Sequence, residues 1–175
     1  MSNRDATLAL LWVAGGGVLG LLAAMIEETI GSFAWASILI VPPIEEMMKP
    51  IGLIFLLDKR PHWLRSSLHV VMLALLGALI FASLENGLYI FVYASKLDGG
   101  YWLFRVTVCT AVHLVATGIF GAGLAKMWQH IKEKGGHFDI DVCFNYFVAA
   151  SILHGLYNLT VVILEAAGVI SFQLQ

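Results

Sequence analysis

Long apolar runs dominate the sequence, and five of them are long enough to cross a membrane. A transmembrane helix needs about 20 predominantly apolar residues. The runs that meet this requirement cover approximately residues 7–26, 33–57, 68–94, 101–127 and 142–169. Only short polar stretches separate them. The pattern therefore predicts an all-α fold, a polytopic transmembrane helical bundle of about five spans.

Two of these runs have features of their own. Arg4 precedes the first run, as in a signal peptide, but a run of about 20 residues exceeds the 7–15 residues of a signal's apolar region. We therefore expect the first run to be a membrane anchor. The second run contains Pro42-Pro43. Proline breaks or kinks a helix, so we expect the second span to be interrupted there.

Composition supports a membrane location. The chain has 59% hydrophobic residues and 13% charged residues, whereas a soluble domain has about 25% charged residues. Most of the surface must therefore face lipid. The net charge of -2 argues neither for nor against a nucleic acid partner, but no basic cluster resembles a phosphate-binding patch, so we expect none. We expect one integral-membrane domain over residues 1–175.

The loops predict an orientation. Positive residues gather in two loops, as Lys59, Arg60 and Arg65 and as Lys126, Lys132 and Lys134. The alternate loops, near residues 27–29 and 96–100, are poor in them. The positive-inside rule places the basic loops in the cytoplasm. Five spans then give a cytoplasmic N-terminus and an extracytoplasmic C-terminus.

Ionisable side chains inside the apolar runs are the strongest functional signal. A charge at the centre of a span costs several kcal/mol unless it is paired or hydrated, so each is a candidate for function. These residues are Glu45, Glu46 and Lys49 in the second run, Glu85 in the third, Arg105 and His113 in the fourth, and His154 in the fifth.

Their depths agree. With a helical rise of about 1.5 Å per residue, Glu45, His113 and His154 lie near mid-membrane. Glu85 and Asn158 lie somewhat nearer the outside. Taken singly, Glu45–Lys49 is explained by a buried ion pair, and each histidine by packing. These readings leave the common depth unexplained, so we expect one shared polar site.

The chemistry of these groups suits hydrolysis, in two alternative forms. A buried carboxylate can act as general base on water, while the imidazoles and Asn158 polarise the carbonyl or stabilise its oxyanion. Alternatively, His113 and His154 with one carboxylate hold Zn²⁺. The common zinc-protease motif HExxH is absent. Thr110 and Thr117 share a helix face with His113 and are candidate partners for it.

Four motifs resemble those of the PrsW family of membrane-embedded proteases. Residues 45–49 resemble its EExxK motif, and residues 81–86 resemble its FxxxEN motif. Arg105 followed by His113, and His154 with Asn158 as HxxxN, resemble the other two. The motifs occur in the right order on successive spans.

The resemblance extends to the wider superfamily of type II CAAX prenyl endopeptidases, whose fold is a helical membrane bundle with a buried polar site. It implies that the glutamate pair holds the catalytic base, with Glu45 favoured over Glu46, and that His113 and His154 are essential. Glu85 would stand where the CAAX branch has a histidine, and Asn158 would assist the oxyanion.

The resulting hypothesis is an endopeptidase that cuts a membrane-anchored protein near the extracytoplasmic half of the bilayer. The possible zinc ligands would be His113, His154 and Glu85, while Lys49, Asn86 and Arg105 would support the site. Two alternatives stay open. One is a non-catalytic scaffold subunit of a larger membrane protease, and the other is a proton-coupled transporter, because carboxylate and imidazole chains also relay protons.

Overall fold

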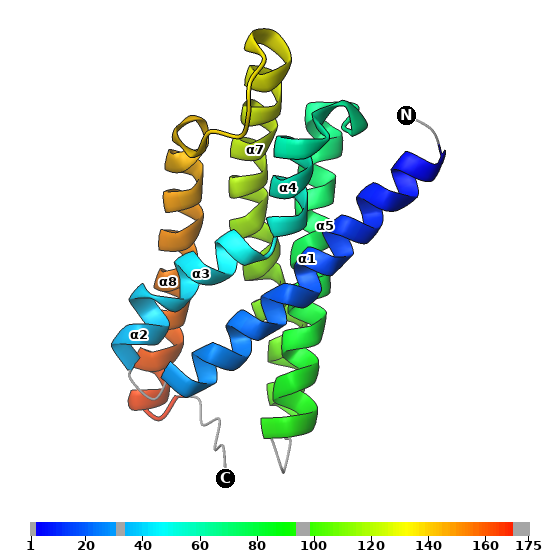
Figure 1. Ribbon diagram of the computed structural model, residues 1–175. Coiled ribbons are helices and arrows are strands. Elements are labelled where there is room, and N and C mark those ends of the chain that lie inside the picture. Colours follow the sequence, from blue (N-terminus) through cyan, green and yellow to red (C-terminus); the bar gives the residue numbers. More distant parts are fainter. Residues whose placement is uncertain (1–2, 31–33, 94–98, 170–175) are drawn as a thin grey trace.

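A computed structural model describes residues 3–30, 34–93 and 99–169, which form helices and short connections without any strand (Figure 1). Four helices are long: α1 (Asn3–Ile30), α5 (Ser67–Leu88), α7 (Thr110–Lys134) and α8 (Phe144–Ala166). Four are short: α2 (Ala34–Leu39), α3 (Val41–Met48), α4 (Ile51–Lys59) and α6 (Gly99–Phe104). The π-helical turns η2 (Tyr89–Tyr93) and η3 (Arg105–Cys109) extend α5 and join α6 to α7, and the 3-10 turns η1 (Pro61–Trp63) and η4 (Ile140–Val142) precede α5 and α8.

Within the part of the chain that the structure describes, three helical segments are long and apolar enough to cross a membrane by themselves, namely Ser67–Phe91, Gly100–Lys134 and Phe144–Ala166. They coincide with the last three predicted spans. The first predicted span lies within α1, which has 28 residues. The second is divided among α2, α3 and α4. The prediction of an all-α membrane bundle of about five spans is therefore confirmed.

Prolines cause the divisions of the second span. Pro42 and Pro43 occupy the first turn of α3, where the missing N–H breaks no helical hydrogen bond. The kink predicted there is confirmed. Pro50 makes a second break between α3 and α4, which the sequence analysis did not predict. The breaks isolate α3 as a short oblique helix with Glu45 and Glu46 on its buried side.

A close crossing of α1 over α4 fixes the position of this interrupted segment. A Cβ on Gly16 would lie 2.5 Å from the backbone nitrogen of Gly52, and a Cβ on Gly52 would collide with the Trp12 carbonyl. Only glycine therefore permits the two backbones to approach so closely, as in other membrane helix pairs. The aromatic rings of Trp12 and Phe55 stack beside the crossing, with centroids 4.2 Å apart.

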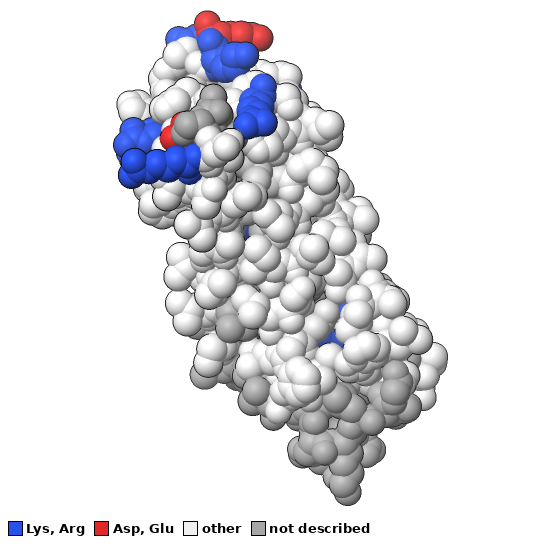
Figure 2. Space-filling model, turned by 90° about the vertical axis from the view of Figure 1, so that its right-hand side faces the viewer, with Lys and Arg blue, Asp and Glu red and all other residues white. Residues whose placement is uncertain are grey.

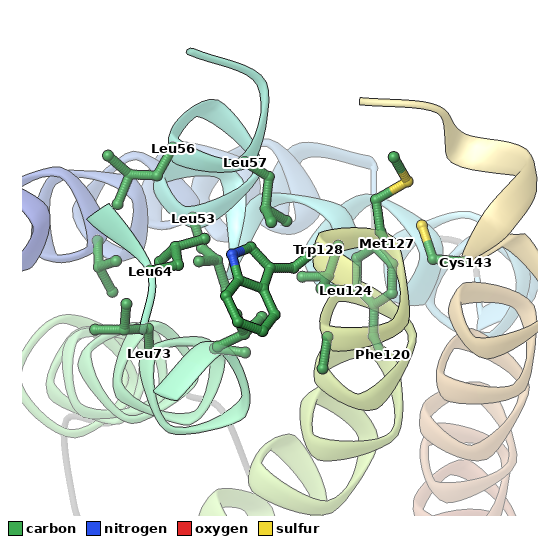
Figure 3. Close-up of a cluster of buried hydrophobic side chains, with 14 of the residues drawn as sticks. Leu53, Leu56, Leu57, Leu64, Leu73, Phe120, Leu124, Met127, Trp128 and Cys143 are labelled. Atoms are coloured by element: carbon green, nitrogen blue, oxygen red, sulfur yellow. The ribbon is translucent and has the colours of Figure 1, made fainter. Parts of the chain in front are cut away.

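An apolar core fills one end of the bundle, between α4, α5 and α7 (Figure 3). Leu53, Leu56, Phe120 and Leu124 are fully buried in it. Trp128 closes the core and donates from its indole nitrogen to the Pro61 carbonyl at 3.2 Å. The core thus holds α4, α5 and α7 together.

The same end of the molecule carries the N-terminus of α1 and the turns that connect α4 to α5 and α7 to α8 (Figure 1). Lys and Arg side chains gather there, whereas the rest of the face seen in Figure 2 is nearly uncharged. Asp58 joins the two turns: it accepts from the backbone of Phe138 at 3.2 Å and lies 3.3 Å from His137 Nδ1. The Lys59 ammonium holds the pKa of Asp58 below its usual range.

This arrangement agrees with the predicted grouping of the N-terminus and the basic loops. The side of the membrane that each end faces stays a prediction. The tail 171–175 and most of the loop 96–100 lie outside the described residues.

Candidate active site

A cavity of about 220 Å³ lies beyond the apolar core, between α3, α5, η3, α7 and α8. Its polar lining brings together six residues that the sequence analysis singled out: Glu45, Glu85, Arg105, His113, His154 and Asn158. Glu45, Glu85, His113 and His154 are buried in the protein. The convergence that their common depth predicted therefore exists.

At the inner end of the cavity, three atoms that could bind a metal ion, from three helices, face one another. Glu45 Oε2 lies 3.8 Å from His113 Nδ1 and 3.8 Å from His154 Nε2. One ligand atom of each residue lies within 4.8 Å of those of the other two. Glu45 Oε2 and His113 Nδ1 are buried and form no hydrogen bond within the described residues, although the Lys49 ammonium lies 3.2 Å from Glu45 Oε2 as an ion pair. Buried polar atoms are normally satisfied, so this group has unused ligand capacity.

Each imidazole contacts a second carboxylate through the ring nitrogen that faces away from Glu45. Glu46 Oε1 lies 3.0 Å from His154 Nδ1. Glu85 Oε2 lies 2.8 Å from His113 Nε2. A carboxylate this close to a ring nitrogen favours a proton on that nitrogen. In the neutral imidazole the opposite nitrogen then has a lone pair, which here faces Glu45.

The two adjacent glutamates have different surroundings. Glu46 is fully buried and accepts from Lys49, His154 and Thr117, the last at 2.9 Å. It does not line the cavity. Glu45 lines the cavity, and among the described residues its Oε2 contacts only Lys49, at 3.2 Å, and the two imidazoles. The carboxylate of Glu46 is thus fully occupied by hydrogen bonds, whereas the carboxylate of Glu45 is available to a ligand in the cavity.

Lys49 connects this cluster electrostatically. Its side chain is 0% exposed, and its ammonium pairs with both Glu45 and Glu46. The ammonium also lies 4.9 Å from the centre of the Phe81 ring. An unpaired buried ammonium would be very costly, so the glutamates and the lysine stabilise one another's charges.

Arg105 organises the outer part of the cavity. Its guanidinium lies 3.0 Å from Glu85 Oε1, donates to Asn86 Oδ1 at 3.2 Å, and stacks 3.8 Å from the centre of the Tyr89 ring. Asn86 in turn donates to Thr110 at 3.0 Å. Arg105 therefore holds Glu85 and Asn86 in place within the protein.

Several placements differ from the sequence-based hypotheses. Glu45 completes the group of three facing ligand atoms, and Glu85 instead contacts the far side of His113. Thr110 accepts from Asn86 and Thr117 donates to Glu46, and within the described residues neither threonine hydrogen-bonds His113. Which residues are ligands stays a prediction.

Asn158 and two residues that sequence reasoning missed complete the wall. Asn158 donates to the Ser37 carbonyl at 2.8 Å. The Cys109 thiol and the Tyr157 hydroxyl lie 2.8 Å apart, and both residues line the cavity. Helical spacing is a signal that could have found them, because Tyr157 follows His154 by three residues and Cys109 precedes His113 by four.

Comparison with known proteins gives a family. The model of the PrsW family of intramembrane metalloproteases matches residues 5–174, nearly the whole chain. No curated protein and no solved structure matches the chain. The family match confirms the predictions of an integral membrane protein and an enzyme, and it favours the protease over the scaffold and the transporter. The chain is therefore a member of the PrsW family of intramembrane metalloproteases.

Proposed function

We propose that this protein is an endopeptidase that hydrolyses a peptide bond of a membrane-associated protein, with Glu45, His113 and His154 as its hydrolytic centre. One observation carries the proposal. Three buried atoms that could bind a metal, from three helices, converge at the inner end of a cavity, and two of them, Glu45 Oε2 and His113 Nδ1, form no hydrogen bond within the part of the chain that the structure describes.

The donor set fits a zinc ion. Two neutral imidazole nitrogens and a carboxylate are ligands that catalytic zinc sites commonly use. Glu45, His113 and His154 would hold the ion, which when bound supplies a Lewis acid that lowers the pKa of water. The Lys49 ammonium contacts the same Glu45 oxygen at 3.2 Å and would have to share it.

The other carboxylates then act through the histidines. Glu46 holds His154 through Nδ1, and Glu85 holds His113 through Nε2. Such outer carboxylates fix the orientation and tautomer of a ligating imidazole. Without a metal ion, Glu45 would itself be the general base, because it is the glutamate of the pair that faces the cavity.

Asn158 is suited to stabilise the oxyanion. Its amide carries two N–H donors, and one of them binds the Ser37 carbonyl. The amide lines the cavity, so the second N–H is available to a carbonyl oxygen that becomes negative during attack. The cavity extends along α8 toward its C-terminal end. The positive-inside rule assigns that end to the extracytoplasmic side, so cleavage would occur in the outer half of the bilayer.

The test is cleavage of single-span reporter proteins in liposomes by the purified protein and by Glu45→Gln. Glu133→Gln, an exposed substitution at the far end of α7, serves as the control. We expect products from the wild type and the control, and none from Glu45→Gln. Equal cleavage by Glu45→Gln would refute the proposed centre.

A further inference from the structure

One face of α8 forms a continuous stripe from the hydrolytic centre to the mouth of the cavity. His154, Asn158, Val161 and Glu165 all line the cavity. Residues of an α-helix are about 100° apart, so positions separated by four, seven and eleven residues return to nearly the same face. Glu165 is eleven residues from His154 and thus lies about 16 Å further along this stripe.

Glu165 is a charged residue at the mouth of the cavity whose carboxylate is available to a ligand. It is exposed, and within residues 3–30, 34–93 and 99–169 it makes no hydrogen bond or ion pair. Arg105, the cation of the cavity lining, is engaged by Glu85 and Asn86. The outer end of the cavity therefore attracts positive charge and repels negative charge.

Aromatic side chains also line this cavity. They are Tyr101 and Phe104 of α6 and Tyr89. Aromatic faces attract ammonium and guanidinium groups, and the stacking of Arg105 on Tyr89 is an example in this cavity. A carboxylate and aromatic rings that line one cavity are complementary to a cationic side chain with an apolar stem.

We propose that the outer end of the cavity is a subsite for a Lys or Arg side chain of the substrate, with Glu165 as its specificity-determining residue. The proposal rests on the proposed function, because it concerns the segment that is cut. An extended chain advances about 3.3 Å per residue. A span of about 16 Å therefore places the basic residue roughly five positions from the scissile bond.

The experiment is a cleavage profile on a library of single-span peptides whose outer juxtamembrane residues are randomised, reconstituted with the enzyme in liposomes. Product sequencing gives the residue frequencies around each cut. The variants are Glu165→Gln, Glu165→Lys, the inactive reference Glu45→Gln and the control Glu133→Gln, which lies at the other end of the molecule.

We expect the wild type and Glu133→Gln to favour Lys or Arg about three- to tenfold at the fifth position. Glu165→Gln should lose this preference, and Glu165→Lys should favour Asp or Glu instead. Loss of packing alone would not reverse a preference, so the reversal separates recognition from structure.

The subsite is refuted if the wild type cuts without a basic preference, or if Glu165→Gln retains it. A lack of products from the wild type, or products that persist in Glu45→Gln, would instead refute the proposed hydrolytic centre, and the subsite with it. Failure of the subsite and failure of the function are therefore distinguishable.

Discussion

Two regions of the bundle have similarly buried side chains of opposite kinds: the apolar core, here called the apolar end, and the buried polar cluster of the site, here called the charged end, which contains Glu45, Glu46, Lys49, Glu85, His113 and His154. Within one interrupted segment, Glu46 and Lys49 are as inaccessible as Leu53 and Leu56 one to two turns later. The leucines pack in the apolar core (Figure 3). The charged residues must instead satisfy one another, because a buried charge without a partner costs several kcal/mol.

The comparison shows that packing of the fold does not require the buried charged residues. An apolar core at both ends would satisfy packing, so stability does not explain the charged end. Most of its polar groups are paired by one another, as Lys49, Glu46 and Arg105 are. Four buried side-chain atoms form no hydrogen bond within the described residues, and two of them, Glu45 Oε2 and His113 Nδ1, lie 3.8 Å apart in residues that line the cavity. This contrast indicates that the charged end serves chemistry.

The largest effect is expected from Glu45→Gln, which alters the charged end without changing its shape. We expect cleavage to fall about a thousandfold or more, because the substitution removes the carboxylate of the hydrolytic centre. Lys49 keeps Glu46 as its partner, so the melting temperature in detergent should change little. A large loss of stability with retained cleavage would show that Glu45 is structural.

Glu46→Gln tests the opposite role for the neighbouring residue. The substitution weakens the ion pair of the fully buried Lys49 and the contact with His154. We expect a loss of about 3–5 kcal/mol in the free energy of unfolding, measured by denaturant titration in detergent. Adding Lys49→Met should restore much of it, and failure of the double variant to recover would argue against a charge effect.

Leu53→Ala disturbs the apolar end alone. The cavity it leaves should cost about 2–4 kcal/mol in unfolding free energy. Well below the melting temperature, kcat/KM should stay within about twofold of the wild type, because the leucine does not line the site cavity. A selective loss of activity in a fully folded sample would show that the two ends are coupled.

When each effect is expressed as a free energy, Arg105→Lys should have the smallest effect of this series. Lysine keeps the charge near Glu85 but cannot also bond Asn86 and stack on Tyr89 as the guanidinium does. We expect kcat/KM to fall about tenfold with little change in melting temperature. An unchanged kcat/KM would show that Arg105 does not position Glu85 for the reaction.

Much of this architecture was predictable from the sequence. The apolar runs gave the membrane helices, and the common depth of Glu45, His113 and His154 indicated one site. Pro42-Pro43 predicted the first break in the second span, whereas Pro50 was overlooked although it breaks a helix for the same physical reason.

The different surroundings of the carboxylates could not be predicted from helical spacing, and only the family resemblance favoured Glu45 over Glu46 as the base. Glu45 and Glu46 are adjacent, so they point about 100° apart on a helix, but sequence does not say which direction faces the cavity. The kink between α2 and α3 and the close crossing of α1 decide this. Depth in the membrane likewise could not show on which side of the His113 ring Glu85 lies. It lies beside Nε2 and not on the Nδ1 side, where the ligand group is.

The central claim is that Glu45 completes a metal centre with His113 and His154, while Glu85 only positions His113. The most direct test is to measure the zinc content of the purified wild type, Glu45→Gln and Glu85→Gln. We predict about one Zn²⁺ per chain in the wild type, loss of zinc in Glu45→Gln, and binding in Glu85→Gln that is weakened about 10–100-fold but still present. Zinc absent from the wild type would contradict the metal centre, and zinc retained in Glu45→Gln but abolished in Glu85→Gln would contradict this assignment of the ligands.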